Sequence, residues 1–146
     1  MLRLLQGDVG SGKTVVALLA AAAVIETGKQ AAFMAPTEIL ARQHLKTISS
    51  LAERAGMRVA ILTGREKGKE RKDILARLAV GEIDLLVGTH AIIQDDVAYR
   101  SLALAIVDEQ HRFGVRERLT LTEKGESVDV LVLSATPIPR TLVLTY

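Results

Sequence analysis

The feature that most constrains this chain is a glycine-rich string near its start. The string reads Gly7-Asp8-Val9-Gly10-Ser11-Gly12-Lys13-Thr14 and fits the pattern G-x-x-x-x-G-K-S/T. A short apolar run precedes it and a long run rich in alanine and leucine follows it, as the motif requires between a strand and a helix. Glycines let successive backbone N–H groups turn towards phosphate oxygens, and the helix N-terminus adds its positive dipole end. This context favours a phosphate-binding loop over a plain glycine-rich turn.

Two side chains of the loop carry the chemistry of phosphate binding. Lys13 supplies a cation for the β- and γ-phosphates, and Thr14 supplies a hydroxyl for Mg²⁺. The chain contains no Asn-Lys-x-Asp string, which guanine-specific GTPases use, and no Leu-Ser-Gly-Gly-Gln string, which transporter ATPases use. Those two absences argue against two other large classes of phosphate-loop protein.

Strand and helix patterns alternate along the rest of the chain. Strands are predicted at 3–6, 30–35, 58–62, 84–88, 102–107 and 128–133, and helices at 13–27, 38–55 and 69–80. Such alternation predicts an α/β fold with a mainly parallel sheet and helices on both faces. The runs Leu85-Leu86-Val87 and Val130-Leu131-Val132-Leu133 are continuously apolar, as expected when both faces of a sheet are covered. Ligands of such sheets bind at the carboxyl ends of the strands, so the motifs that follow strands should converge on one edge.

Length and composition set further bounds. The chain has 146 residues, which predicts a single domain spanning 1–146. It has no cysteine, so disulfides, cysteine-based zinc sites and thiol catalysis are excluded. The longest apolar run covers 15–25, which is shorter than the ~20 residues of a membrane span, and no basic signal segment precedes it. We therefore expect a cytoplasmic protein that makes no membrane contact. The net charge of +2 is too small to argue for nucleic acid by itself.

A second motif ends the apolar run Leu104-Ala105-Ile106-Val107 in two adjacent acids, Asp108 and Glu109. Asp108 at the strand end can hold Mg²⁺, and Glu109 can polarise the attacking water, because neighbouring positions point in different directions. Taken alone, the pair could be a solvated turn. The upstream phosphate loop favours the catalytic interpretation, with Lys13, Asp108 and Glu109 as the catalytic candidates.

Three longer strings resemble one family. Asp108-Glu109-Gln110-His111 is similar to the DExH motif of superfamily 2 helicases. Arg3-Leu4-Leu5-Gln6 before the phosphate loop and Ser134-Ala135-Thr136-Pro137 near the end narrow the resemblance to RecG-type branched-DNA helicases, over nearly the whole chain. The nearest alternative is the transcription-repair coupling factor, which usually has Glu where Gln110 stands. A non-catalytic nucleotide-binding module is a further alternative, although such a module has no need of Glu109.

The resemblance implies a RecA-like phosphate-loop NTPase fold, forming the first motor lobe of an ATP-dependent helicase that remodels double-stranded, branched DNA. It implies ATP and Mg²⁺ as cofactors, with Thr14 and Asp108 as the metal ligands. A second RecA-like lobe and a DNA-reading domain are expected elsewhere in a longer parent chain. The implied residues that couple the state of ATP to DNA movement are Gln110, His111, Ser134, Ala135 and Thr136. The implied DNA contacts are Thr37, Gln43, Gly64, Arg65, Thr89 and His90.

Several of these residues have a simpler alternative role. Thr37 is equally placed to cap the helix that follows it. His90 could be a turn histidine, and Ser134 and Thr136 could simply end a strand. The basic run at 65–72 is typical of a solvated face. The three histidines are far apart with no ligand-like spacing, so no metal site held by protein side chains alone is predicted.

Overall fold

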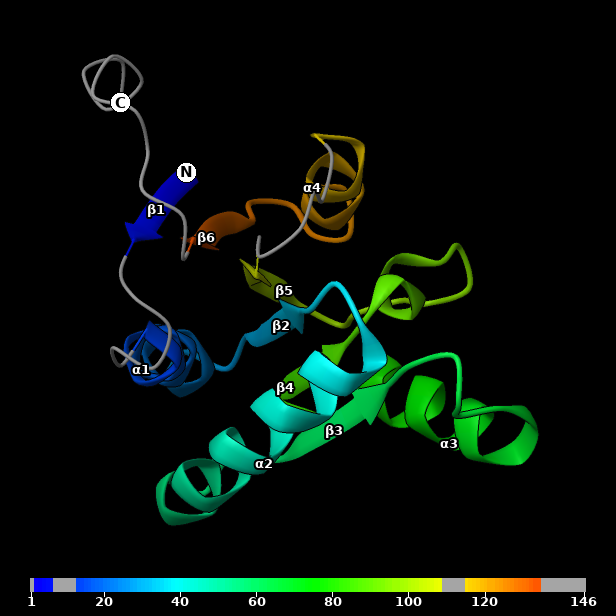
Figure 1. Cartoon of the computed structure of the whole chain (residues 1–146). Helices are drawn as coiled ribbons and strands as arrows, with labels where there is room; N and C mark the ends of the chain where they lie inside the picture. Colours follow the sequence, from blue (N-terminus) through cyan, green and yellow to red (C-terminus); the bar gives the residue numbers. More distant parts are fainter. Residues whose placement is uncertain (1, 7–12, 109–114, 135–146) are drawn as a thin grey trace.

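A six-stranded parallel sheet forms the centre of the computed structural model (Figure 1). The structure describes the backbone of residues 2–6, 13–108 and 115–134, and the side chains of residues 14–108 and 119–133. The strands follow the order β1-β6-β5-β2-β4-β3, and every neighbouring pair is parallel. Their bounds are β1 (Leu2–Gln6), β2 (Gln30–Met34), β3 (Val59–Leu62), β4 (Leu85–Gly88), β5 (Leu102–Asp108) and β6 (Asp129–Ser134). The predicted α/β fold is confirmed.

Helices cover both faces of the sheet. Their bounds are α1 (Lys13–Glu26), α2 (Glu38–Ala55), α3 (Gly68–Ala79) and α4 (Val115–Thr122), with a 3₁₀ turn η1 (His90–Ile93). The helices α1 and α2 share one hydrophobic cluster with the sheet, and α3, η1 and α4 share the other. Within the part of the chain that the structure describes, no helix is both long and apolar enough to cross a membrane.

Alternating residues of the central strands enter the two clusters. On β2, Ala31 and Phe33 pack with α1 and α2, whereas Ala32 and Met34 pack with the opposite layer. Every residue of β2 and β4 is buried. Burial on both sides is the reason that these strands read as continuous apolar runs rather than as alternating ones.

Capping residues mark both ends of α2. The Thr37 side chain accepts a hydrogen bond from the backbone N–H of Leu40 at 3.2 Å, which caps the helix. Gly56 follows the last turn with φ +74, a conformation that glycine adopts without strain. The helix predicted at 38–55 is therefore confirmed to the residue. The other predicted elements differ from the observed ones by one residue at one or both ends, and the prediction omits η1 and α4.

Candidate nucleotide-binding site

The carboxyl ends of the strands meet at one edge of the sheet because all the strands run in the same direction. The strand β1 ends at Gln6, directly before the predicted phosphate loop, and β5 ends at Asp108. The strand β6 lies between them, with Ser134 beside Gln6 and Leu133 beside Asp108. The expected convergence of the motifs on one edge is thereby confirmed for the strand ends. It places the start of the phosphate loop one strand away from the acidic motif.

Asp108 is held by a residue that the sequence motifs do not include. It is 4% exposed, and its Oδ2 lies 2.7 Å from Nε2 of His44 on α2. A carboxylate can only accept, so Nε2 is the nitrogen that carries the hydrogen. The His44 ring also packs against Phe33 on β2, with ring centroids 4.7 Å apart and planes inclined by 43°. Asp108 at the end of β5 is therefore held by His44 of α2, and the His44 ring is held in turn by Phe33 of β2.

A sequence signal for this contact exists in the pattern of α2. Ala41, Ile48 and Ala52 are the buried residues of the helix, so its inward stripe passes through position 44. A histidine on an inward stripe needs a polar partner, because a buried hydrogen-bonding group without one is costly. The sequence alone does not identify the partner, which is 64 positions away.

The described residues fit a magnesium–nucleotide complex in their chemistry. Thr14 lies in the first turn of α1, where the backbone N–H groups of the helix N-terminus lack intrahelical partners. A hydroxyl from Thr14 and a carboxylate from Asp108 are hard oxygen ligands, and Mg²⁺ is usually bound by one or two carboxylates together with substrate phosphates. This donor set is the one that the sequence predicts for the metal.

Other predicted site residues lie outside the described part of the chain. For Lys13 and Ser134 the structure describes the backbone, at the first residue of α1 and the last residue of β6 respectively. The predicted roles that lie wholly outside the described residues are those of Gly7, Asp8, Val9, Gly10, Ser11, Gly12, Glu109, Gln110, His111, Ala135 and Thr136. These roles remain predictions.

At the same edge of the sheet, where the carboxyl ends of the strands meet, a network of charged groups joins α2 to the loop after β3. Arg42 Nη2 donates to Glu66 Oε2 at 2.8 Å, and the backbone N–H and the hydroxyl of Thr63 donate to Glu66 Oε1 at 2.8 and 2.9 Å. Glu66 is only 6% exposed. Burial by itself would raise the pKa of Glu66, but the hydrogen bonds from Arg42 and Thr63 outweigh it and hold this pKa below its usual value.

Most of the predicted DNA contacts are open to solvent, and Gln43, Gly64 and Arg65 are sequence neighbours of the residues of this network. Gln43, Gly64, Arg65 and His90 are exposed, and Thr89 is half-buried. The Arg65 side chain is 70% exposed although its Nε lies 3.0 Å from Glu38 Oε1. Gly64 and Arg65 follow β3, Thr89 and His90 follow β4, and Gln43 lies in the second turn of α2. Their contacts with DNA remain predictions.

Two residues of this edge have a structural role of their own. Thr37 is exposed, and its hydroxyl caps α2, which is the alternative role that the sequence leaves open. Gly88 precedes the predicted contact pair Thr89 and His90. A Cβ at Gly88 would lie 2.1 Å from the backbone oxygen of Leu62 and 2.4 Å from Ile92, so the close approach of β3 and η1 requires glycine there.

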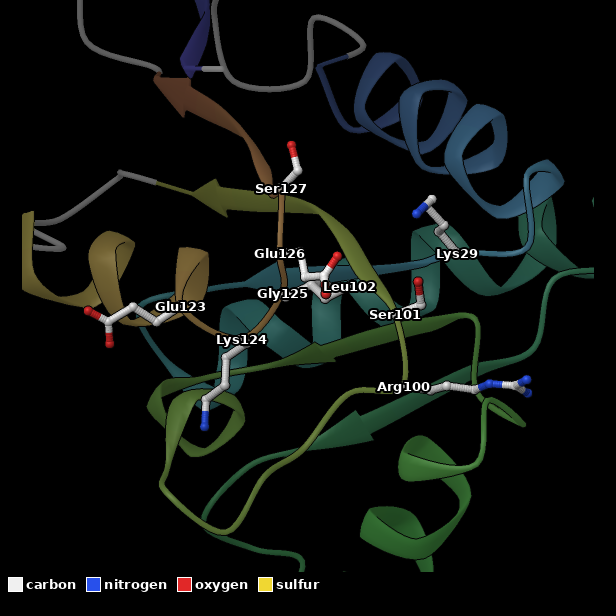
Figure 2. A pocket seen from close by; sticks show the side chains of 9 residues that line it. All are labelled: Lys29, Arg100, Ser101, Leu102, Glu123, Lys124, Gly125, Glu126 and Ser127. Atoms are coloured by element: carbon white, nitrogen blue, oxygen red, sulfur yellow. The ribbon is translucent and has the colours of Figure 1, made fainter.

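A hollow of about 580 Å³ lies at the opposite edge, between the amino ends of the strands. Figure 2 shows its lining, with Lys29 and Ser101 before β2 and β5 and Lys124 after α4. Lys124 Nζ donates hydrogen bonds to the backbone oxygens of Gln94 and Val97, at 2.8 and 2.9 Å. Because Asp108 ends its strand at the other edge, this hollow is separate from the candidate nucleotide site.

Comparison with known proteins adds sequence and structural relatives. Residues 3–144 match the family described as DEAD/DEAH box helicase. The chain is 60% identical over 145 residues to the "ATP-dependent DNA helicase RecG" of Bacillus subtilis and 57% identical over 145 residues to that of Streptococcus pneumoniae. Each match covers 99% of this chain and 21% of the relative, so the chain spans about a fifth of the curated relatives it matches.

Two solved structures are similar to this chain. The structure titled "Structure of RecG bound to three-way DNA junction" matches with a TM-score of 0.84 and 51% identity, over 97% of this chain and 19% of that chain. The helicase MrfA bound to DNA matches with a TM-score of 0.75 at 19% identity, over 98% of this chain and 22% of that chain. The second likeness concerns the fold alone.

Proposed function

Since the chain belongs to the DEAD/DEAH box helicase family, we propose that it is the ATP-binding motor lobe of an ATP-dependent DNA helicase that remodels branched DNA. The observation that carries the proposal is the arrangement of the carboxyl edge. The end of β1, which leads into the phosphate-loop sequence, lies one strand away from Asp108 at the end of β5. Identity of 60% to a RecG helicase supports RecG-type activity rather than that of a transcription-repair coupling factor.

The proposed roles follow from the chemistry of each residue. The loop Gly7–Thr14 binds the phosphates of ATP, with Lys13 as the neutralising cation. Thr14 and Asp108 would hold Mg²⁺, which when bound would supply positive charge to neutralise the phosphates of ATP. Glu109 orients the attacking water. Gln110, His111, Ser134, Ala135 and Thr136 carry the state of the nucleotide to the DNA side.

The proposed helicase needs more than this lobe. The chain spans 21% of its RecG relatives, which supports a longer parent with a second RecA-like lobe and a DNA-reading domain. One such relative was solved with a three-way DNA junction, and this supports branched DNA as the substrate here. We place the protein in the cytoplasm, where a DNA motor of this kind finds both ATP and its substrate.

Calorimetric titration of the chain with Mg-ATP tests the proposal. Lys13→Ala should weaken binding at least tenfold, because it removes a cation from the triphosphate while the backbone groups of the loop remain. Lys29→Ala is the matched control, since Lys29 is an exposed lysine at the opposite edge of the sheet. Equal affinities for the unmodified chain, Lys13→Ala and Lys29→Ala would overturn the proposed nucleotide site.

A further inference from the structure

We propose that His44 is a positioning residue for Asp108, which sets the carboxylate for metal binding from the helix α2. The inference rests on the proposed function, because it concerns how the Mg²⁺ of the nucleotide is held. The starting observation is the 2.7 Å contact between His44 Nε2 and Asp108 Oδ2. His44 belongs to none of the motifs that predict the site.

The contact fixes the rotation of the Asp108 side chain. Both side chains are largely buried, with 17% of His44 and 5% of Asp108 exposed, so the hydrogen bond is shielded from competing water. With Oδ2 held by His44, Oδ1 is the oxygen through which we expect Asp108 to bind the metal ion, directly or through water. Groups that orient a metal ligand in this way commonly change metal affinity by about 10- to 100-fold.

The His44 ring is itself held in place from the other side. Phe33 packs against it at 4.7 Å between centroids, and Phe33 is 1% exposed in the middle of the sheet. Phe33 pairs in register with Ile106, two residues before Asp108 on the neighbouring strand. The ring and the carboxylate are thus supported by adjacent strands, so their relative position is set by the sheet and not by a mobile loop.

The helix α2, which carries His44, also carries a predicted DNA contact. Gln43, the neighbour of His44 along the helix, is exposed and is one of the predicted DNA contacts. A single helix therefore presents one residue to the nucleotide edge and the next to solvent on the predicted DNA side.

The test measures metal binding directly. Free Mn²⁺ is followed by electron paramagnetic resonance as it is titrated into the chain with ADP or with a non-hydrolysable ATP analogue. His44→Phe removes the N–H donor and keeps a ring beside Phe33, so the Mn²⁺ dissociation constant should rise about tenfold. His44→Gln keeps an N–H donor of similar reach and should restore most of the affinity. Lys46→Gln, an exposed change on the same helix, should have no effect.

Parallel measurements separate positioning from damage to the fold. Thermal unfolding and circular dichroism report whether each variant is folded, and nucleotide binding in EDTA should be equal in all of them. Should His44→Phe fail to fold, His44→Asn, whose amide is too short to reach Oδ2, should show the same rise. Equal Mn²⁺ affinity in His44→Phe and the unmodified chain would overturn the inference alone. Absence of nucleotide binding by the unmodified chain would overturn both the inference and the proposed function.

Discussion

Arg42 and Glu66 form an ion pair with 2.8 Å between Nη2 and Oε2, although they lie on different elements. Arg42 is in the second turn of α2, and Glu66 is in the loop between β3 and α3. The pair therefore joins the two segments that carry the predicted DNA contacts Gln43 and Arg65. Since Glu66 is buried and also accepts from Thr63, the loop is tied to the body of the domain at its base.

The first prediction concerns the stability that Glu66 supplies. Glu66→Gln should lower the free energy of unfolding at pH 7 by roughly 1–3 kcal/mol, because the pairing of Arg42 with the buried Glu66 carboxylate is lost and Arg42 keeps Glu38, at 3.3 Å, as an ionic partner. Urea unfolding of the two proteins measures the difference. Glu70→Gln, an exposed change in the first turn of α3, is the control and should stay within about 0.5 kcal/mol of the unmodified chain.

The same pair predicts a dependence on pH. In the folded state the pKa of Glu66 is lowered below its ordinary value of 4.5, so the stabilising contribution of Glu66 is complete above that pH. The contribution is lost as the pH falls through the lower folded pKa. Between pH 6 and pH 3 the unmodified chain should therefore lose more stability than Glu66→Gln does. If the free energies of unfolding of the two proteins fell in parallel over this pH range, the proposed stabilising role of ionised Glu66 would be contradicted.

The third prediction concerns the close approach at Gly88. Gly88→Ala places a methyl group 2.1 Å from the Leu62 backbone oxygen, so β3 or β4 must shift. We expect a loss of roughly 1–3 kcal/mol in the free energy of unfolding, measured by urea titration. Gly64→Ala is the control, since a Cβ at Gly64 meets nothing within 4 Å. Loss of the same size in both variants would show that backbone freedom, rather than packing, is what glycine provides at these positions.

Local signals explain why much of the fold could be predicted from the sequence. The helix α2 begins and ends where Thr37 and Gly56 place its caps, and both signals lie within a few residues of the helix. The strands follow from continuous apolar runs because both faces of the sheet are covered. In contrast, α4 is a short helix with little apolar periodicity, and it is stabilised by the burial of Leu121 in the cluster that α4 shares with α3, η1 and the sheet.

Contacts between distant segments could not be predicted in the same way. Gln30 begins a predicted strand, yet in the fold it is 3% exposed and its Nε2 donates to the backbone oxygens of Leu78 and Ile83. Its Oε1 accepts from the backbone N–H of Ser101. The partner of His44 is likewise set by the way α2 packs on the sheet, which brings position 44 to the end of β5. Phosphate-loop and DExH strings predict which residue types a site needs, whereas such supporting contacts depend on the tertiary arrangement.

The fourth prediction concerns DNA binding in the intact helicase. Gln43→Ala and His90→Ala should weaken binding to forked DNA by a similar factor for all sequences, because contacts to the phosphate backbone carry no sequence information. Fluorescence anisotropy with forks of different base composition measures this. Lys29→Ala at the opposite edge of the sheet is the control. A change confined to one base composition would contradict backbone contact.

The fifth prediction is that this chain alone hydrolyses ATP negligibly and is not stimulated by DNA, although Asp108 and Glu109 are both present. Phosphoryl transfer depends mainly on positioning and on neutralising charge in the transition state. An arginine that reaches the γ-phosphate from a partner is worth about 10³–10⁵ in rate, or roughly 4–7 kcal/mol. In the proposed helicase that arginine belongs to the second lobe, and by family resemblance neither Arg112 nor Arg140 takes its place.

Steady-state ATPase measurements with and without forked DNA, on this chain and on the intact helicase, test the fifth prediction. Stimulation by DNA requires the two lobes to close on the nucleotide, and one lobe has no partner to close on. The intact helicase should therefore respond to forked DNA, whereas the chain alone should give the same low rate in both conditions. Asp108→Asn in the intact helicase gives the rate expected when the proposed metal ligand is missing. DNA-stimulated turnover by the chain at a rate near that of the intact helicase would show that its own residues complete the catalytic site, and the two-lobe argument would then be wrong.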